Sequence, residues 1–237
     1  MHRFLVTRVD GGTVTFSTEQ AHQLKDVLRL RPGDRVRTFD GQQRSDRIVE
    51  LLSFADGRVI GEVPQAPEPR TTLVVCPALL PRDKFEQVLQ KLTEVGAAAI
   101  QPVLTARSLV RAQPDEARLH RWRSILCEAT EQSGRGRVPE LRPALLFGRA
   151  LANAQGTVLL AAAGERQSTS LGAALRDADS TISLFVGPEG GFEPWELDQA
   201  REAGARIVNL GSHVLRAETA SPVLAALVLY ELEGRDA

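Results

Sequence analysis

The chain has 237 residues, of which 43% are hydrophobic and 25% charged, and its formal net charge is −1. This composition is typical of a globular protein and excludes a chain dominated by disorder. A near-neutral charge also excludes a general electrostatic affinity for nucleic acid, so an RNA-binding surface would require local segregation of charge.

Residues 1–68 are predicted to form a small β-barrel. Short apolar runs bounded by turn residues indicate strands at 4–6, 13–16, 34–39, 47–51 and 58–63, with one helix at 18–28. Asp-Gly pairs at 40–41 and 56–57 are typical of hairpin turns. Pro64, Pro67 and Pro69 then disfavour regular structure, which places a domain boundary there.

Residues 71–237 are predicted to form an α/β domain with a mostly parallel sheet. Strands are expected at 73–76, 98–103, 158–162, 182–186 and 207–210. Helices are expected at 85–95 with Gly96 as C-cap, from Pro114 to about Ala129, and from Pro194 to near Gly204. A last helix, with Ser221 and Pro222 in its first turn, should end near Gly234.

The two cysteines, Cys76 and Cys127, are far apart and form no CxxC motif. We therefore predict two buried thiols rather than a metal site or a disulfide. The N-terminus lacks the apolar core of a signal peptide, and no apolar run is long enough to span a bilayer. The expectation is a cytoplasmic protein without a membrane partner.

Two loops follow predicted strands at the sheet edge where ligands bind in parallel α/β proteins. The first reads GPEGG at 187–191; a ligand-binding loop and a tight structural turn are equally good interpretations. The second, at 210–220, brings Arg216, Glu218 and Thr219 together, although a salt-bridged helix N-terminus would look the same. No phosphate-loop lysine follows either loop, which disfavours a nucleotide hydrolase.

A third segment, 132–137, presents two arginines on a glycine-bearing loop. It suits phosphate contact, or equally a solvated helix end. Together with the two loops, it resembles the RsmE family of bacterial methyltransferases that act on N3 of a uridine in 16S ribosomal RNA. The matching stretches are 22–29, 83–86, 91–96, 131–135, 138–139, 186–192 and 210–220, the last containing LRAETA.

The resemblance implies a SPOUT-type α/β knot, with a C-terminal trefoil knot, preceded by a PUA-like β-barrel. It also implies a homodimer that uses S-adenosylmethionine, releases S-adenosylhomocysteine and needs no metal. Its partner would be 16S rRNA in the small ribosomal subunit. Cofactor binding is then expected from loop residues after three strands: Ala162, Gly187, Glu189, Gly190, Gly191, Leu210, Gly211, Val214, Leu215, Thr219 and Ala220.

The catalytic pair implied by the resemblance is Arg216, which would polarise the uracil carbonyls, and Glu218, which would hold Arg216 or accept a proton. The proton acceptor is left open, because an arginine stays protonated. RNA contact is expected from nine residues: Arg3, His22, Arg29, Arg31, Lys84, Arg107, Gln132, Arg135 and Arg137.

This sequence departs from the family pattern at Ala106, where an acidic residue is usual, and at Ala217, where threonine is frequent. Ala106 is therefore assigned no role. Two alternatives stay open: a SPOUT-like methyltransferase acting on another nucleotide, and a non-catalytic RNA-binding factor in ribosome assembly. Methyl transfer to identified RNA would separate them.

Overall fold

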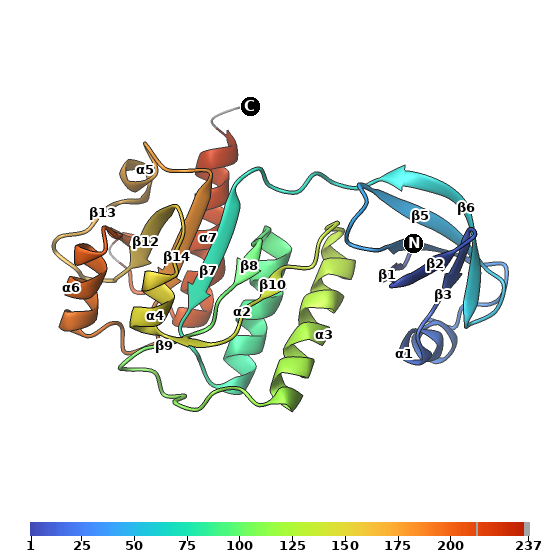
Figure 1. The fold of residues 1–237 in the computed structure, drawn as a ribbon, viewed down its shortest axis with the longest axis horizontal. Coiled ribbons are helices and arrows are strands. Elements are labelled where there is room, and N and C mark those ends of the chain that lie inside the picture. Colours follow the sequence, from blue (N-terminus) through green and yellow to red (C-terminus); the bar gives the residue numbers. More distant parts are fainter. Residues whose placement is uncertain (212, 235–237) are drawn as a thin grey trace. The chain divides into compact units, whose positions relative to one another are not determined.

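The computed structural model describes residues 1–211 and 213–234 (Figure 1). The chain forms two compact units, the first made of Met1–Glu68 together with Thr130–Val138. The second unit contains the other described residues. The segment Thr130–Val138, assigned to the second domain by its position in the sequence, thus belongs to the unit built by the N-terminal strands.

The first unit is a curled six-stranded sheet with strand order β1-β4-β5-β6-β3-β2. Its strands are β1 (Arg3–Leu5), β2 (Arg8–Asp10), β3 (Thr13–Thr15), β4 (Arg35–Phe39), β5 (Ser45–Leu51) and β6 (Asp56–Pro64). The predicted strands are confirmed, and β2 is an addition. The predicted helix is confirmed as α1 (Thr18–His22), continued by the π-helical turn η1 (Gln23–Val27). The core of this unit is formed by Leu24 together with residues in the strands or next to their ends: Phe4, Val6, Val14, Phe16, Val36, Val49 and Leu51.

The second unit contains a seven-stranded sheet with strand order β10-β8-β7-β14-β12-β15-β13, in which every neighbouring pair is parallel. The strands are β7 (Thr72–Pro77), β8 (Ala99–Ile100), β10 (Glu140–Leu141), β12 (Thr157–Ala161), β13 (Thr169–Ser170), β14 (Thr181–Val186) and β15 (Arg206–Asn209). A separate parallel pair joins β9 (Val103–Leu104) to β11 (Leu145–Leu146). The predicted α/β class with a mostly parallel sheet is confirmed.

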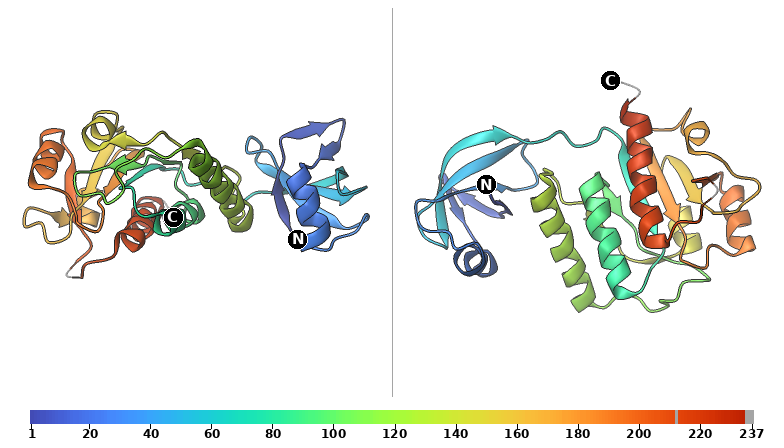
Figure 2. Two further views of the ribbon diagram at one scale, coloured as in Figure 1. Left: turned by 90° about the horizontal axis from the view of Figure 1, so that it is seen from below. Right: turned by 180° about the vertical axis from the view of Figure 1, so that it is seen from behind.

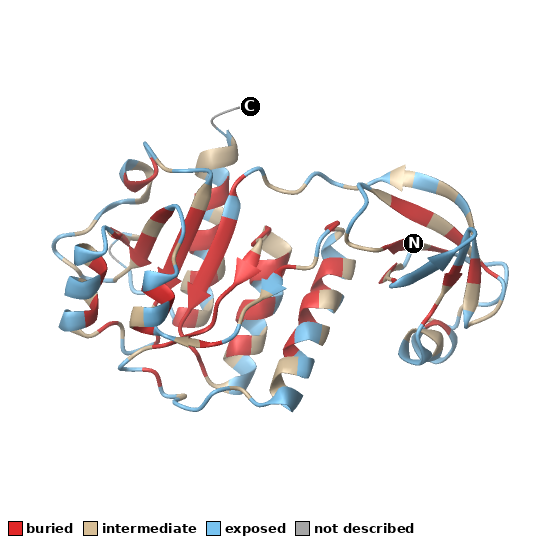
Figure 3. Cartoon of the chain, in the orientation of Figure 1, coloured by how far each residue is buried: buried red, intermediate tan, exposed pale blue. Residues whose placement is uncertain are grey.

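Helices cover both faces of this sheet, as a parallel sheet requires. They are α2 (Arg82–Val95), α3 (Glu116–Ser133), α4 (Phe147–Ala152), α5 (Leu171–Ala174), α6 (Pro194–Glu202) and α7 (Ala217–Glu233). Helices α2 and α7 lie side by side on one face, and α4 and α6 pack on the other (Figure 2). The central strands are buried along most of their length (Figure 3).

Local sequence patterns predicted several helix ends correctly. Gly96 caps α2 with φ +113°, where its missing Cβ avoids the left-handed penalty, and Pro194 occupies the first position of α6. The expected start of the last helix is wrong, because α7 begins at Ala217 and Pro222 lies inside it.

Two further expectations need correction. The predicted strand at 98–103 is divided between β8 and β9, which belong to different sheets and are separated by Gln101 and Pro102. Cys76 is buried, and burial raises the pKa of its thiol to about 12. Cys127, however, is only half-buried. The trefoil knot stays a prediction.

Candidate active site

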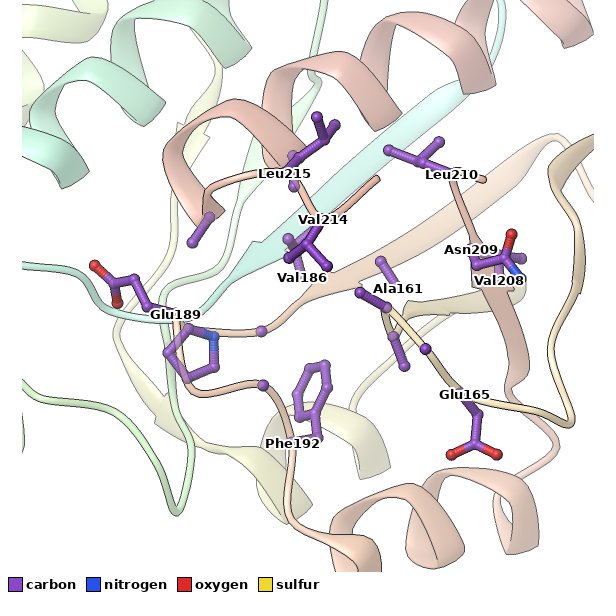
Figure 4. A pocket seen from close by; sticks show the side chains of 18 of the residues that line it. Ala161, Glu165, Val186, Glu189, Phe192, Val208, Asn209, Leu210, Val214 and Leu215 are labelled. Atoms are coloured by element: carbon purple, nitrogen blue, oxygen red, sulfur yellow. The ribbon is translucent and has the colours of Figure 1, made fainter. Parts of the chain in front are cut away.

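The loops that follow β12, β14 and β15 surround one pocket of about 380 Å³. Strand β12 lies between β14 and β15 in the sheet, so the carboxyl ends of all three strands meet at one edge. Figure 4 shows side chains from the three loops around the pocket, with Glu165 and Glu189 on different sides of it. The volume lies within the range of roughly 300–1,000 Å³ that is usual for small-molecule sites.

The expected cofactor residues map closely onto this pocket. Ten of the eleven line it: Ala162, Gly187, Glu189, Gly190, Gly191, Leu210, Gly211, Val214, Leu215 and Ala220. The exception is Thr219, which is exposed and does not contribute to the lining. Ser212, which belongs to the predicted loop 210–220, lies outside the described residues.

The GPEGG segment forms a tight turn closed by a hydrogen bond from the Gly191 N–H to the Pro188 carbonyl, 2.9 Å long. Gly191 has φ +68°, a conformation that glycine adopts without penalty. A Cβ on Gly187 would come within 3.0 Å of the buried Phe192 ring, so the chain approaches that ring closely. The loop therefore offers a ligand its backbone groups and the Glu189 carboxylate.

Arg107 supports the turn from outside. Its Nη1 donates to the Gly190 carbonyl at 2.9 Å, and its Nε and Nη2 donate to the Glu193 carboxylate at 2.9 and 3.1 Å. Pairing with Glu193 raises the pKa of Arg107 and lowers that of Glu193. Arg107 was expected to contact RNA. In the structure it lies in the wall of the pocket, with part of its side chain exposed.

Lys84, in the first turn of α2, bridges two carboxylates beside the pocket. Its Nζ donates to Oε1 of Glu189 at 2.6 Å and lies 3.7 Å from Oε1 of Glu218. The hydrogen bond between Lys84 and Glu189 raises the pKa of the amine and lowers the pKa of the carboxyl. Lys84 was expected to bind RNA; in the structure it ties the GPEGG turn to the start of α7.

Arg216 is the N-cap of α7, with extended backbone (φ −64°, ψ 150°) and an exposed side chain. Its neighbours Leu215 and Ala217 line the pocket, whereas Arg216 and Glu218 do not. Glu218 was expected to hold Arg216, but it forms an ion pair with Lys84 instead. Its Oε2 is buried and has no hydrogen-bond partner among the described residues.

Ala106, where the family pattern is broken, lies in a loop fixed by a buried carboxylate. Glu196 is fully buried in α6; its Oε1 accepts from the Ala106 N–H at 3.0 Å and its Oε2 from the Glu193 N–H at 2.8 Å. The segment that carries Arg107 is therefore held against the start of α6 by backbone contacts that do not depend on the side chain at 106.

In the first unit, two of the arginines expected to contact RNA have buried side chains, with 6% of the Arg3 side chain and 9% of the Arg135 side chain exposed. Arg3 makes two hydrogen bonds with Asp46, at 2.7 and 2.8 Å, and stacks 3.7 Å from the centre of the Phe39 ring. Arg135 is buried and paired with Glu68. Each guanidinium already has a carboxylate partner inside the first unit. The expectation that Arg3 and Arg135 contact RNA directly is therefore corrected.

The remaining residues expected to contact RNA are exposed: His22, Arg29, Arg31, Gln132 and Arg137. Arg29 has a positive φ of 54°, which is unusual for a non-glycine residue and belongs to the tight turn after η1. Nδ1 of His22 lies 2.7 Å from the Asp26 carboxylate. These five side chains are accessible to a ligand of the first unit.

Residues 66–229 match the RNA methyltransferase domain family. The chain is 36% identical to ribosomal RNA small subunit methyltransferase E of Synechocystis sp., over 94% of this chain and 74% of that protein. The chain therefore belongs to the ribosomal RNA small subunit methyltransferase E (RsmE) family.

Solved structures agree with this assignment. The RsmE of Neisseria gonorrhoeae bound to S-adenosyl methionine has a TM-score of 0.86 and 32% identity, covering 98% of both chains. A methyltransferase of Legionella pneumophila in complex with SAM has a TM-score of 0.83 and 26% identity, covering 98% of this chain and 96% of that one.

The pocket of this RsmE chain also contains residues that the sequence analysis did not predict. Phe192, Leu197 and Leu224 add apolar walls, and Glu165 and Asn209 add polar ones. Asn209 ends β15 and accepts from the Gly211 N–H at 3.1 Å, so a polar residue at a strand end was an available signal. Leu197 and Leu224 lie inside helices, where helical periodicity cannot separate core from pocket.

Among residues 1–211 and 213–234, no cluster of three or more His, Cys, Asp or Glu side chains could hold a metal ion. In the same part of this RsmE chain, none of the helices has the length and apolar character needed to cross a membrane.

Proposed function

We propose that this protein transfers a methyl group from S-adenosylmethionine to N3 of a uridine in 16S ribosomal RNA. The observation that carries the proposal is the pocket formed by three glycine-containing loops at the carboxyl edge of β12, β14 and β15, in a chain of the RsmE family. Its neighbour from Neisseria gonorrhoeae binds the same cofactor with the same fold.

The residues of the pocket fit the chemistry of that cofactor. Apolar side chains, among them Val186, Val208 and Leu215, suit the adenine ring, and glycine N–H groups suit its ribose and carboxylate oxygens. Glu165 and Glu189, which pair with Arg201 at 3.1 Å and with Lys84 at 2.6 Å, place carboxylate oxygens in the lining that can accept hydrogen bonds from the cofactor's amine. When bound, the cofactor supplies a methyl group that is already activated by its positive sulfur.

The protein's own task is to prepare the nucleophile. Uracil N3 carries a proton and attacks poorly until that proton leaves, so the enzyme must stabilise the anionic base. Arg216, exposed beside the pocket residues Leu215 and Ala217, is positioned to polarise a uracil carbonyl. Two residues further along the chain, the unpartnered Oε2 of Glu218 is the proposed proton acceptor, with Lys84 holding the carboxylate in place.

The test is incubation of the purified protein with radiolabelled S-adenosylmethionine and undermethylated small subunits, followed by mass mapping of the modified base. Incorporation at uridine N3 is expected. Incorporation at another nucleotide, or none, would refute the proposal. Arg216→Ala should bind the cofactor normally while turnover falls about 100- to 1,000-fold, the usual loss when one donor to a developing oxyanion is removed. Arg123→Ala, an exposed arginine in α3, is the matched control.

The first unit is proposed to hold the RNA through its exposed basic turn. Arg29 and Arg31 are exposed there and close to His22 in sequence, which suits recognition of shape and backbone rather than bases. Because the proposed substrate is ribosomal RNA, a cytoplasmic location is proposed as well. Arg29→Ala with Arg31→Ala should raise the KM for RNA and leave cofactor affinity unchanged.

A homodimer is proposed to form through α7. Val223, Leu227 and Tyr230 are 37%, 38% and 76% exposed and recur at helical spacing, so they form one apolar stripe. Leu227→Asp should convert the dimer to a monomer in analytical ultracentrifugation. Val27→Asp, which changes a side chain 65% exposed in the first unit, should leave the mass unchanged. A monomeric wild-type protein would refute the dimer.

A further inference from the structure

A second cavity, of about 520 Å³, opens in the α/β unit beside the cofactor pocket. We call it the Trp195 cavity; its walls include Ala106, Arg111, Phe147, Arg149, Trp195 and Gln199. These residues come from the loop after β9, from α4 and from the first six residues of α6. Neither the cofactor nor the catalytic pair proposed above uses this cavity.

An exposed aromatic ring is its first notable feature. Trp195, the second residue of α6, is 57% exposed, whereas the other tryptophan, Trp122, is fully buried. A large ring left in water at a cavity mouth offers a flat surface on which a nucleobase can stack. Base–aromatic stacking contributes substantially to single-stranded RNA binding and tolerates any base.

Positive charge is the second feature. Arg111 and Arg149 are both exposed, and among residues 1–211 and 213–234 neither has an ion-pair partner. The acidic residue of the cavity wall, Glu196, is fully buried and accepts two backbone N–H groups. Two unpaired guanidinium groups next to an aromatic ring match the phosphate and base of one nucleotide.

The third feature is proximity to the cofactor pocket. Phe147 lines the Trp195 cavity and Phe192 lines the cofactor pocket, and the centres of their rings are 5.4 Å apart. The neighbouring residues Ala106 and Arg107 likewise face the two spaces, one each. One layer of side chains therefore separates the Trp195 cavity from the cofactor pocket.

From these features we propose that the Trp195 cavity binds a nucleotide that flanks the methylated uridine in the same RNA strand. Its base stacks on Trp195, and its phosphates contact Arg111 and Arg149. The proposal rests on the proposed function in one respect: it takes the ligand to be part of the RNA substrate. It adds a strand-binding site in the α/β unit, separate from the first unit.

The test uses full-length protein and fluorescently labelled hexauridylate, with affinity read by anisotropy. Trp195→Ala should weaken binding between about 5-fold and about 100-fold, and Trp195→Phe should retain most of the affinity because a ring remains. The double variant Arg111→Ala with Arg149→Ala should make the negative slope of log affinity against log salt shallower by about 1.4, or roughly 0.7 per phosphate contact. Arg123→Ala should leave that slope unchanged. In the wild type, quenching of tryptophan emission should report the exposed Trp195.

Binding of uridine monophosphate distinguishes a site for an RNA strand from a site for a free nucleotide. It should bind far more weakly than hexauridylate; equal affinity would overturn the strand proposal. Unchanged hexauridylate affinity in Trp195→Ala would also overturn it, as would a change in oligomeric mass without a change in RNA affinity. Methyl transfer by the wild type is measured in parallel. If transfer is normal while the Trp195 variants bind like wild type, this inference alone fails; if transfer is absent, the proposed function fails.

Discussion

Glu196 is the residue whose removal should reveal how the loops of the site are held. It is fully buried, and its carboxylate accepts the Ala106 N–H at 3.0 Å and the Glu193 N–H at 2.8 Å. Glu196→Ala deletes both acceptors and leaves two backbone donors without partners. Glu196→Gln keeps one carbonyl oxygen but turns an amide N–H toward the other donor.

The expected loss of stability follows from these two contacts. A hydrogen bond to a charged group contributes about 1.5–3 kcal/mol. Glu196→Ala should therefore destabilise the fold by roughly 3–5 kcal/mol, and Glu196→Gln by about half as much. Since each kcal/mol shifts Tm by about 2–4 °C in a chain of this size, Tm should fall by on the order of 10 °C in Glu196→Ala.

Differential scanning calorimetry measures this shift, with Glu202→Ala as the control. Glu202 lies on the same helix but is exposed, so its removal should change Tm by about 1 °C or less. Equal Tm values for Glu196→Ala and Glu202→Ala would refute the reasoning. So would Glu196→Gln being as destabilising as Glu196→Ala, because the count of lost acceptors would then not govern the effect.

Three further predictions concern the pocket and the core. Gly191→Ala and Gly204→Ala both place a Cβ at positive φ in open space, so each should cost about 1 kcal/mol; only Gly191→Ala should also alter cofactor affinity, measured by calorimetric titration. The hydrogen bond between Lys84 and Glu189 lowers the pKa of the Glu189 carboxyl and raises the pKa of the Lys84 amine. The ion pair is therefore lost only when pH falls through the lowered pKa of Glu189 or rises through the raised pKa of Lys84. The pairing itself should accordingly persist from about pH 6 to about pH 9, and an NMR titration in which the Glu189 carboxyl changes its protonation within that interval would contradict the assignment. The Cys76 thiol, with its pKa raised to about 12, should react with iodoacetamide at pH 8 only as fast as the fold opens.

Patterns within short stretches of sequence were enough to predict most elements. Strand β14 is a continuous apolar run ended by the GPEGG turn, and α6 begins at a proline, so both could be located without knowing their neighbours. Where a boundary depended on a distant contact, prediction failed. The start of α7 is one case: its first residue, Ala217, packs into the fold, and the proline signal at 222 lies inside the helix.

The candidate site divides in the same way. Glycine and charge at strand ends predicted the loops, but the sequence could not tell that Lys84 pairs with Glu189 and Glu218, or that Arg3 lies buried against Asp46. An arginine or lysine has the same local signature whether it faces solvent or a buried carboxylate. Its partner is fixed by contacts between residues 43 or 105 positions apart in the chain.

The sequence by itself determined the kinds of element, their order, and the turns at which the backbone can approach a ligand, because these depend on residues a few positions apart. Only the tertiary structure decided that β12 lies between β14 and β15, which brings three separate turns around one pocket. Strand order is set by the packing of whole faces of the sheet against helices, and that free energy is distributed over the entire unit.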